Sequence, residues 1–70
     1  MPVENRVKEI RQNNQLTQIQ LADAVGVTRQ TIIALEKGSY TPSVGLALKL
    51  AQVLNARVEH LFWLRSGEGE

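Results

Sequence analysis

Few side chains in this 70-residue chain are suited to catalysis or to metal binding. His60 is the single histidine, cysteine is absent, and no carboxylates cluster near His60. A metal site needs several such ligands, and nucleophilic catalysis needs a base beside its nucleophile. The sequence also contains no glycine-rich phosphate loop. We therefore expect no enzymatic activity, no metal, no cofactor and no small-molecule ligand in this chain.

The composition is that of an ordinary soluble protein, with 43% apolar residues, 21% charged residues and a net charge of +1. No apolar run is long enough to span a bilayer, and the lack of cysteine fits a reducing compartment. We expect a cytoplasmic protein without membrane contact. Because a charge of +1 is small, any nucleic-acid partner must be argued from the positions of individual groups.

Helix-breaking residues divide the chain into short segments, and within each segment the apolar residues repeat every three to four positions. This pattern predicts an all-α fold, a compact five-helix domain over residues 1–65 with no sheet, and a flexible tail at 66–70. The breaks lie at Asn13–Asn14, Gly26, Gly38–Pro42 and Asn55.

Capping residues indicate where these helices begin and end. The first helix is opened by Pro2 and carries Val3, Val7 and Ile10, and the fifth supplies Val58, Leu61 and Phe62. Thr17 and Gln20 have capping-box spacing, Thr28 and Ser43 are N-cap types, and Gly26 and Gly38 suit left-handed ends. The predicted core face of the fourth helix is Ala47, Leu50, Ala51 and Leu54.

The second and third segments have the spacing of a helix-turn-helix at Gln18–Lys37. Ala22 is small where the next helix must cross closely, and Gly26 permits the positive φ that turns the chain. Ile32 and Leu35 fill the angle between the two helices. Together with the caps, this spacing predicts a helix-turn-helix.

The sequence contains the blocks Arg6-x-x-x-x-Arg11, Leu16-Thr17-Gln18, Leu21-Ala22, Val25-Gly26-Val27-Thr28-Arg29-Gln30-Thr31-Ile32, Leu35-Glu36-Lys37-Gly38, Pro42-Ser43, Ala47-x-x-Leu50-Ala51-x-x-Leu54 and Leu61-Phe62. In these blocks the chain resembles the XRE family, the helix-turn-helix proteins of the lambda repressor and Cro type. The resemblance covers about Val3 to Trp63. It implies a lambda-repressor-like domain that binds double-stranded DNA as a transcriptional regulator, and it favours a repressor.

In the resembling fold the third helix lies in the major groove, which places Arg29 and Gln30 at the base edges. Arginine suits guanine and glutamine suits adenine, each through two hydrogen bonds. Ile33 and Ala34 face outward next and offer only contact with a thymine methyl group. The alternative is that Arg29 and Gln30 are simply solvated residues at a helix start.

The resemblance also implies phosphate contacts on either side of the third helix. Gln18 opens the second helix, where free amides and the helix dipole favour an anion. Tyr40 has an alternative, since it could equally pack on the fourth helix. The expected phosphate-contacting residues are Gln18, Thr28, Thr31, Lys37, Ser39, Tyr40 and Thr41.

The family pattern further pairs Arg11 of the first helix with Glu36 near the end of the third. Such a pair orients the DNA-reading helix, and it adds little net stability once desolvation is counted. Its expected role is therefore architectural.

Apolar residues near the C-terminus exceed what one face of each short helix can bury. Val53, Trp63 and Leu64 are the expected interface of a homodimer, which would match a palindromic operator. The alternative is that Trp63 caps the core of a monomer. Two other hypotheses stay open: a protein-interaction module with a protein partner, as in antitoxins of this fold, and a module attached to a sensor domain.

Overall fold

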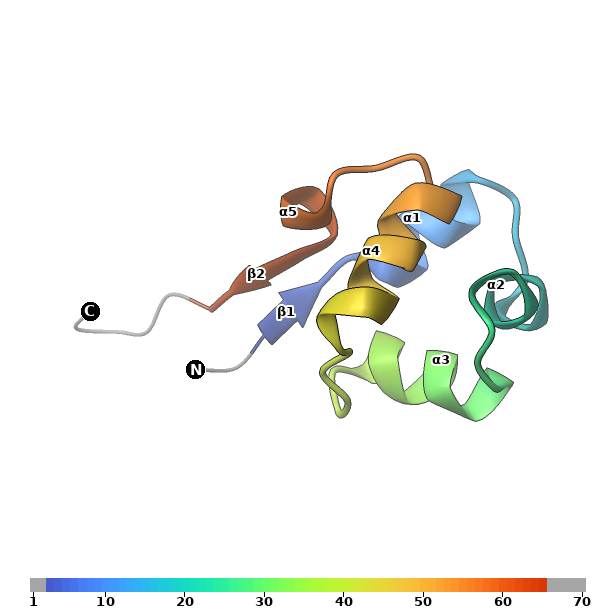
Figure 1. Cartoon of the computed structure of the whole chain (residues 1–70), viewed down its shortest axis with the longest axis horizontal. Helices are drawn as coiled ribbons and strands as arrows, with labels where there is room; N and C mark the ends of the chain where they lie inside the picture. Colours follow the sequence, from blue (N-terminus) through green and yellow to red (C-terminus); the bar gives the residue numbers. More distant parts are fainter. Residues whose placement is uncertain (1–2, 66–70) are drawn as a thin grey trace.

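In the described part of the chain, five helices enclose one apolar core, and two short strands form a ribbon that projects from the helical body (Figure 1). The computed structural model describes residues 3–65, so the expected flexible tail at 66–70 lies outside the described residues. The elements in chain order are β1 (Val3–Asn5), α1 (Val7–Asn13), α2 (Gln18–Val25), α3 (Arg29–Lys37), α4 (Val44–Val53), α5 (Val58–Leu61) and β2 (Phe62–Leu64).

Side-chain caps begin three of the helices, as the sequence predicts. The Thr17 hydroxyl accepts a bond from the Gln20 amide at 3.1 Å, and the Gln20 side chain accepts one from the Thr17 amide at 2.8 Å. Thr28 caps α3 through the Thr31 amide, and Ser43 caps α4. Each cap satisfies a backbone donor that the first helical turn leaves unpaired.

Left-handed residues end the helices on either side of the turn. Gly26 has φ of 79° and Gly38 has φ of 83°, conformations that cost glycine little. Asn55, just past α4, has φ of 55°. These three predicted breaks are therefore confirmed, and so is the fourth, because α1 ends at Asn13.

The core joins residues from every helix, with the fully buried Leu50 of α4 among them. One predicted core position is wrong: Leu46 is buried at 8% exposure, whereas Ala47 is only half-buried. The buried apolar residues are Val7, Leu21, Ala22, Val25, Ile32, Leu35, Leu46, Leu50, Ala51, Leu54 and Leu61.

The two strands correct the all-α prediction. β1 and β2 pair antiparallel, with Glu4 opposite Trp63 and Asn5 opposite Phe62. The Arg6 amide continues the pairing by donating to the Leu61 carbonyl at 3.0 Å. Consequently Val3 does not belong to the first helix, nor Phe62 to the fifth. The spacing of Val3 and Val7 fits a helix. Each strand, however, forms by pairing with a segment about 60 residues away in the sequence, and local periodicity cannot detect such pairing.

Among the helices of residues 3–65, none is long and apolar enough to cross a membrane.

Candidate nucleic-acid interface

The unit of α2, the Gly26 turn and α3 has the geometry of a helix-turn-helix, with α3 at the lower edge of the view in Figure 1. Ala22 is 2% exposed and lies in the same core cluster as Ile32 and Leu35, which are completely buried. The apolar face of α3 is thus fixed against α2, and its polar face is left to solvent.

Arg29 and Gln30 occupy the first turn of α3, and both are exposed. Within residues 3–65, neither side chain forms a hydrogen bond or an ion pair with the protein. Their donors and acceptors are therefore available to an external partner. Ile33 and Ala34, further along α3, are half-buried.

Several of the hydroxyls expected at phosphates are already engaged. The Thr28 and Thr31 hydroxyls lie 3.1 Å apart and share one hydrogen bond, so only one of the two protons is free. The Ser39 hydroxyl donates to the Ala34 carbonyl at 3.2 Å. Because a phosphate oxygen only accepts, Ser39 would have to give up this bond to bind one.

Lys37, Tyr40 and Thr41 are exposed at the end of α3 and in the loop that leads to α4. Tyr40 is 41% exposed, which leaves its ring accessible from outside the domain. Lys37 is the last residue of α3 and the other two follow it, whereas Arg29 and Gln30 lie at the start of the helix.

A buried polar network joins the first three helices around the carboxylate of Glu36. Arg11 donates through Nε at 2.7 Å and through Nη2 at 3.3 Å, and the two side chains are 8% and 4% exposed. Gln18 donates its Nε2 to the same carboxylate at 3.1 Å. Arg11 also donates to the Leu16 carbonyl at 2.8 Å. The network holds α1, the start of α2 and the end of α3 in one arrangement.

The bond between Gln18 and Glu36 was missed by sequence reasoning, which paired Glu36 with Arg11 alone. The two residues are 18 positions apart on different helices, and no local pattern joins them. An amide nitrogen has two protons, so Gln18 keeps a second donor while the first is held by Glu36. That second donor, at the N-terminus of α2, suits an anion.

The residues expected at a dimer interface do not share one environment. Val53 is half-buried and packs against the core, whereas Trp63 and Leu64 lie on β2 with exposures of 38% and 60%. The Arg6 guanidinium lies 4.7 Å from the Trp63 ring centre, a cation–π contact.

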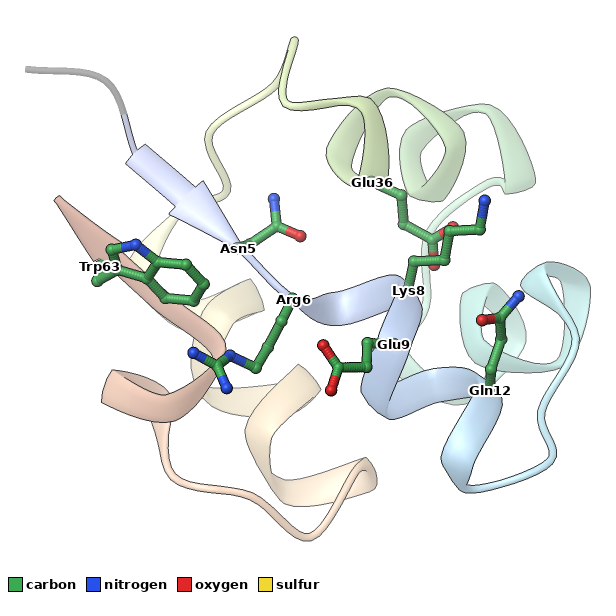
Figure 2. Close-up of a pocket in the computed structure, with 7 residues that line it drawn as sticks. All are labelled: Asn5, Arg6, Lys8, Glu9, Gln12, Glu36 and Trp63. Carbon is green, nitrogen blue, oxygen red and sulfur yellow. The ribbon is translucent and has the colours of Figure 1, made fainter. Parts of the chain in front are cut away.

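An open hollow lies beside this pair, and its lining residues come from β1, α1, α3, β2 and the Arg6 position between β1 and α1 (Figure 2). Its volume is about 490 Å³. Its charged residues are two cations, Arg6 and Lys8, and two carboxylates, Glu9 and Glu36. Such mixed charge selects no single class of ligand. No group of three or more potential metal ligands occurs within residues 3–65.

The two capped helices pack through buried residues, and the second helix presents unbonded polar side chains at its start. This is the arrangement of helix-turn-helix DNA-binding proteins. The chain belongs to the XRE-type helix-turn-helix family: the family model described as helix-turn-helix matches residues 7–61. Proteins of this family are DNA-binding transcriptional regulators, which is not a class of enzymes.

Relatives and solved structures agree with this assignment. An uncharacterized HTH-type transcriptional regulator, YgzD of Bacillus subtilis, is 47% identical over 62 residues, which cover 89% of this chain and 94% of that protein. Another, from Archaeoglobus fulgidus, is 54% identical over 57 residues, covering 81% of each chain. The crystal structure of the restriction-modification controller protein C.AhdI from Aeromonas hydrophila superposes with a TM-score of 0.72 at 30% identity, covering 77% of this chain and 82% of that one.

Proposed function

We propose that this protein is a sequence-specific transcriptional regulator that reads DNA with Arg29 and Gln30. The observation that carries the proposal is their position: both are exposed in the first turn of α3, and neither bonds to the described part of the protein. Arginine pairs with guanine O6 and N7, and glutamine with adenine N6 and N7. Ile33 and Ala34 add apolar contact with thymine methyl groups.

Phosphate contacts would fix the register of α3 on the duplex. Gln18 supplies its second amide proton, and Lys37 supplies a charge at the opposite end of the helix pair. Tyr40 and Thr41 extend this set from the following loop, and one of Thr28 and Thr31 has a free hydroxyl proton. Ser39 is the weakest member because its hydroxyl is bonded to the Ala34 carbonyl.

The active species is proposed to be a homodimer on a palindromic operator. Exposed apolar residues supply the interface: Val44 at 78%, Leu48 at 56% and Leu64 at 60% exposure. Val53 contributes less because it already packs against its own core. Two copies would read half-sites about 34 Å apart, one turn of DNA. Bound across a promoter, such a dimer represses by excluding polymerase.

The test is selection of bound sequences from a randomised duplex pool at moderate salt. The parent protein is expected to enrich a palindrome, and the double variant Arg29→Ala/Gln30→Ala is expected to enrich nothing. The matched control is Lys49→Ala/Gln52→Ala, which removes an exposed cation and an exposed amide from α4 instead. Enrichment of the same sequence by the Arg29 double variant would exclude these two residues as the readout.

A second candidate function follows from the same apolar exposure. Val44, Leu48 and Leu64 fit a different protein as well as a second copy, which is the arrangement of an antitoxin-like interaction module. Light scattering on the purified chain and on material from native lysate separates the two. A dimer that binds the selected palindrome supports the regulator, and a stoichiometric heteromer without DNA preference supports the interaction module.

A further inference from the structure

Asn5, a residue outside the helix-turn-helix, is bonded to the backbone of α3. The Nδ2 of Asn5 in β1 donates to the Leu35 carbonyl in α3 at 2.9 Å, across 30 residues of sequence. Its Oδ1 accepts from the Val7 amide at 3.0 Å, in the first turn of α1. One amide therefore serves the end of one helix and the start of another.

These two backbone groups lie in the terminal turns of their helices. The first amides and the last carbonyls of an α-helix lack partners within the helix. Leu35 lies in the last turn of α3, where its carbonyl also accepts the Gly38 amide at 3.0 Å. Asn5 supplies a second donor to that carbonyl, and this bond joins the last turn of α3 to β1.

Two consecutive residues of α3 are thus held by the N-terminal segment. Leu35 is held by Asn5 of β1, and Glu36 is held by Arg11 of α1. Asn5 is itself fixed, because it is opposite Phe62 in the ribbon. The C-terminal turn of α3 is therefore held from outside the helix pair, in addition to the bond that Gln18 of α2 makes to Glu36.

The position of this turn matters for the other end of the helix. α3 has nine residues, Arg29–Lys37, so it is about 13 Å long at 1.5 Å per residue. A tilt of about 5° at the C-terminal turn moves the first turn by about 1 Å. Hydrogen bonds to base edges keep their strength over only about 0.5 Å, so such a tilt would weaken base readout.

We propose that Asn5 is a positioning residue for DNA reading: its amide fixes the last turn of α3 to β1 and so sets the angle at which Arg29 and Gln30 meet the bases. The inference rests on the proposed function, because it concerns the same reading face. It assigns to the ribbon a part in DNA recognition although no ribbon residue need touch DNA.

Three variants isolate the bond to Leu35. Asn5→Asp keeps the oxygen that accepts from Val7 and replaces the donor to Leu35 by an acceptor. Asn5→Ser is uncharged and keeps a short acceptor, but has no amide donor. The matched control is Asn14→Asp, because the Nδ2 of Asn14 also donates to carbonyls, those of Ile10 at 2.8 Å and Leu54 at 3.4 Å, but not to any residue of α3.

The measurement is the affinity of each full-length protein for the selected operator and for a scrambled duplex of the same composition, at one salt concentration. Circular dichroism at the assay temperature establishes that each variant is folded. We expect both Asn5 variants to lose about three- to tenfold in operator affinity, the size of one neutral hydrogen bond. On scrambled DNA, Asn5→Asp should bind as tightly as Asn14→Asp, which introduces the same charge. Asn5→Ser, which is uncharged, should bind scrambled DNA as tightly as the parent protein.

The possible outcomes have different meanings. Operator affinity that is unchanged in both Asn5 variants overturns the positioning role, and so does an equal loss in Asn14→Asp. If both Asn5 variants unfold while Asn14→Asp stays folded, Asn5 acts on stability alone and the proposal is again wrong. A parent protein that does not distinguish operator from scrambled DNA contradicts the proposed function itself, which separates the two failures.

Discussion

The α2–α3 unit and the β1–β2 ribbon are held together by different kinds of interaction. The helix pair has side-chain caps at both starts, left-handed glycines at both ends and completely buried contacts between its helices. The ribbon has three residues in each strand, with Trp63 and Leu64 partly open to solvent. A two-stranded ribbon alone is marginally stable in water, so it depends on the helices it adjoins.

The two regions therefore differ in how much they contribute to the stability of the domain. Side chains that must meet base edges need a rigid support, and the helix pair supplies one from local interactions and a shared core. The ribbon adds only the half-buried Phe62 to the edge of that core, while Trp63 and Leu64 are largely exposed. We therefore expect substitutions in the helix pair and its buried network to change stability strongly, and substitutions in the ribbon to change it weakly.

The largest expected effect is at the buried ion pair. Arg11→Ala leaves the Glu36 carboxylate buried without its charged partner, and should lower the free energy of unfolding by about 3–5 kcal/mol. Urea denaturation followed by circular dichroism measures this loss. The control is Arg11→Met/Glu36→Leu, which removes both charges and should cost far less. An equally large loss in the double variant would show that packing, not charge, dominates here.

A smaller effect is expected at the turn. Gly26→Ala places a Cβ at φ of 79°, where an L-residue is strained, and should cost about 1–2 kcal/mol. No atom lies within 4 Å of that Cβ, so the cost is conformational and not steric. Thermal denaturation gives the change in midpoint. Gly26→Asn should lose less, because asparagine tolerates the left-handed region, and equal losses would contradict this account.

A gain in stability is expected from a glycine inside α4. Gly45 has ordinary helical geometry, and a Cβ there would meet nothing within 4 Å. Gly45→Ala should therefore stabilise the isolated domain by about 0.5–1 kcal/mol, through the loss of freedom in the unfolded chain. Thermal denaturation at a concentration where the chain is monomeric is the appropriate measurement. A loss of stability would indicate a constraint on α4 within the domain.

The smallest effect is expected in the ribbon. Glu4 pairs with Arg65, but their side chains are 35% and 61% exposed, so water and salt screen the interaction. Glu4→Gln should change the free energy of unfolding by less than about 1 kcal/mol. Urea titrations at low and high salt measure both the change and its screening. A loss comparable to that of Arg11→Ala would abolish the contrast between the two regions.

The α2–α3 unit was predictable from the sequence, whereas the β1–β2 ribbon was not. Thr17 with Gln20, Thr28, Gly26 and Gly38 act within a few residues of themselves, so the helices and the turn were predictable from spacing. The pairing of Glu4 with Trp63 joins opposite ends of the chain, and three-residue strands are too short to establish a period of two. The exposure of Arg29 and Gln30 likewise follows from local spacing, because both lie in the first turn after the Thr28 cap. Their role in reading DNA stays a prediction. The bonds of Asn5 to Leu35 and of Gln18 to Glu36 needed three-dimensional positions.

The ribbon also has a consequence for synthesis of the protein on the ribosome. Because β1 pairs with β2, the first strand stays unpaired until Phe62–Leu64 has left the exit tunnel, although all five helices can form before that. A nascent or prematurely terminated chain thus carries Asn5 on a segment with no strand beside it. Such fragments would hold α3 less firmly than the finished protein, and would compete poorly with it for an operator.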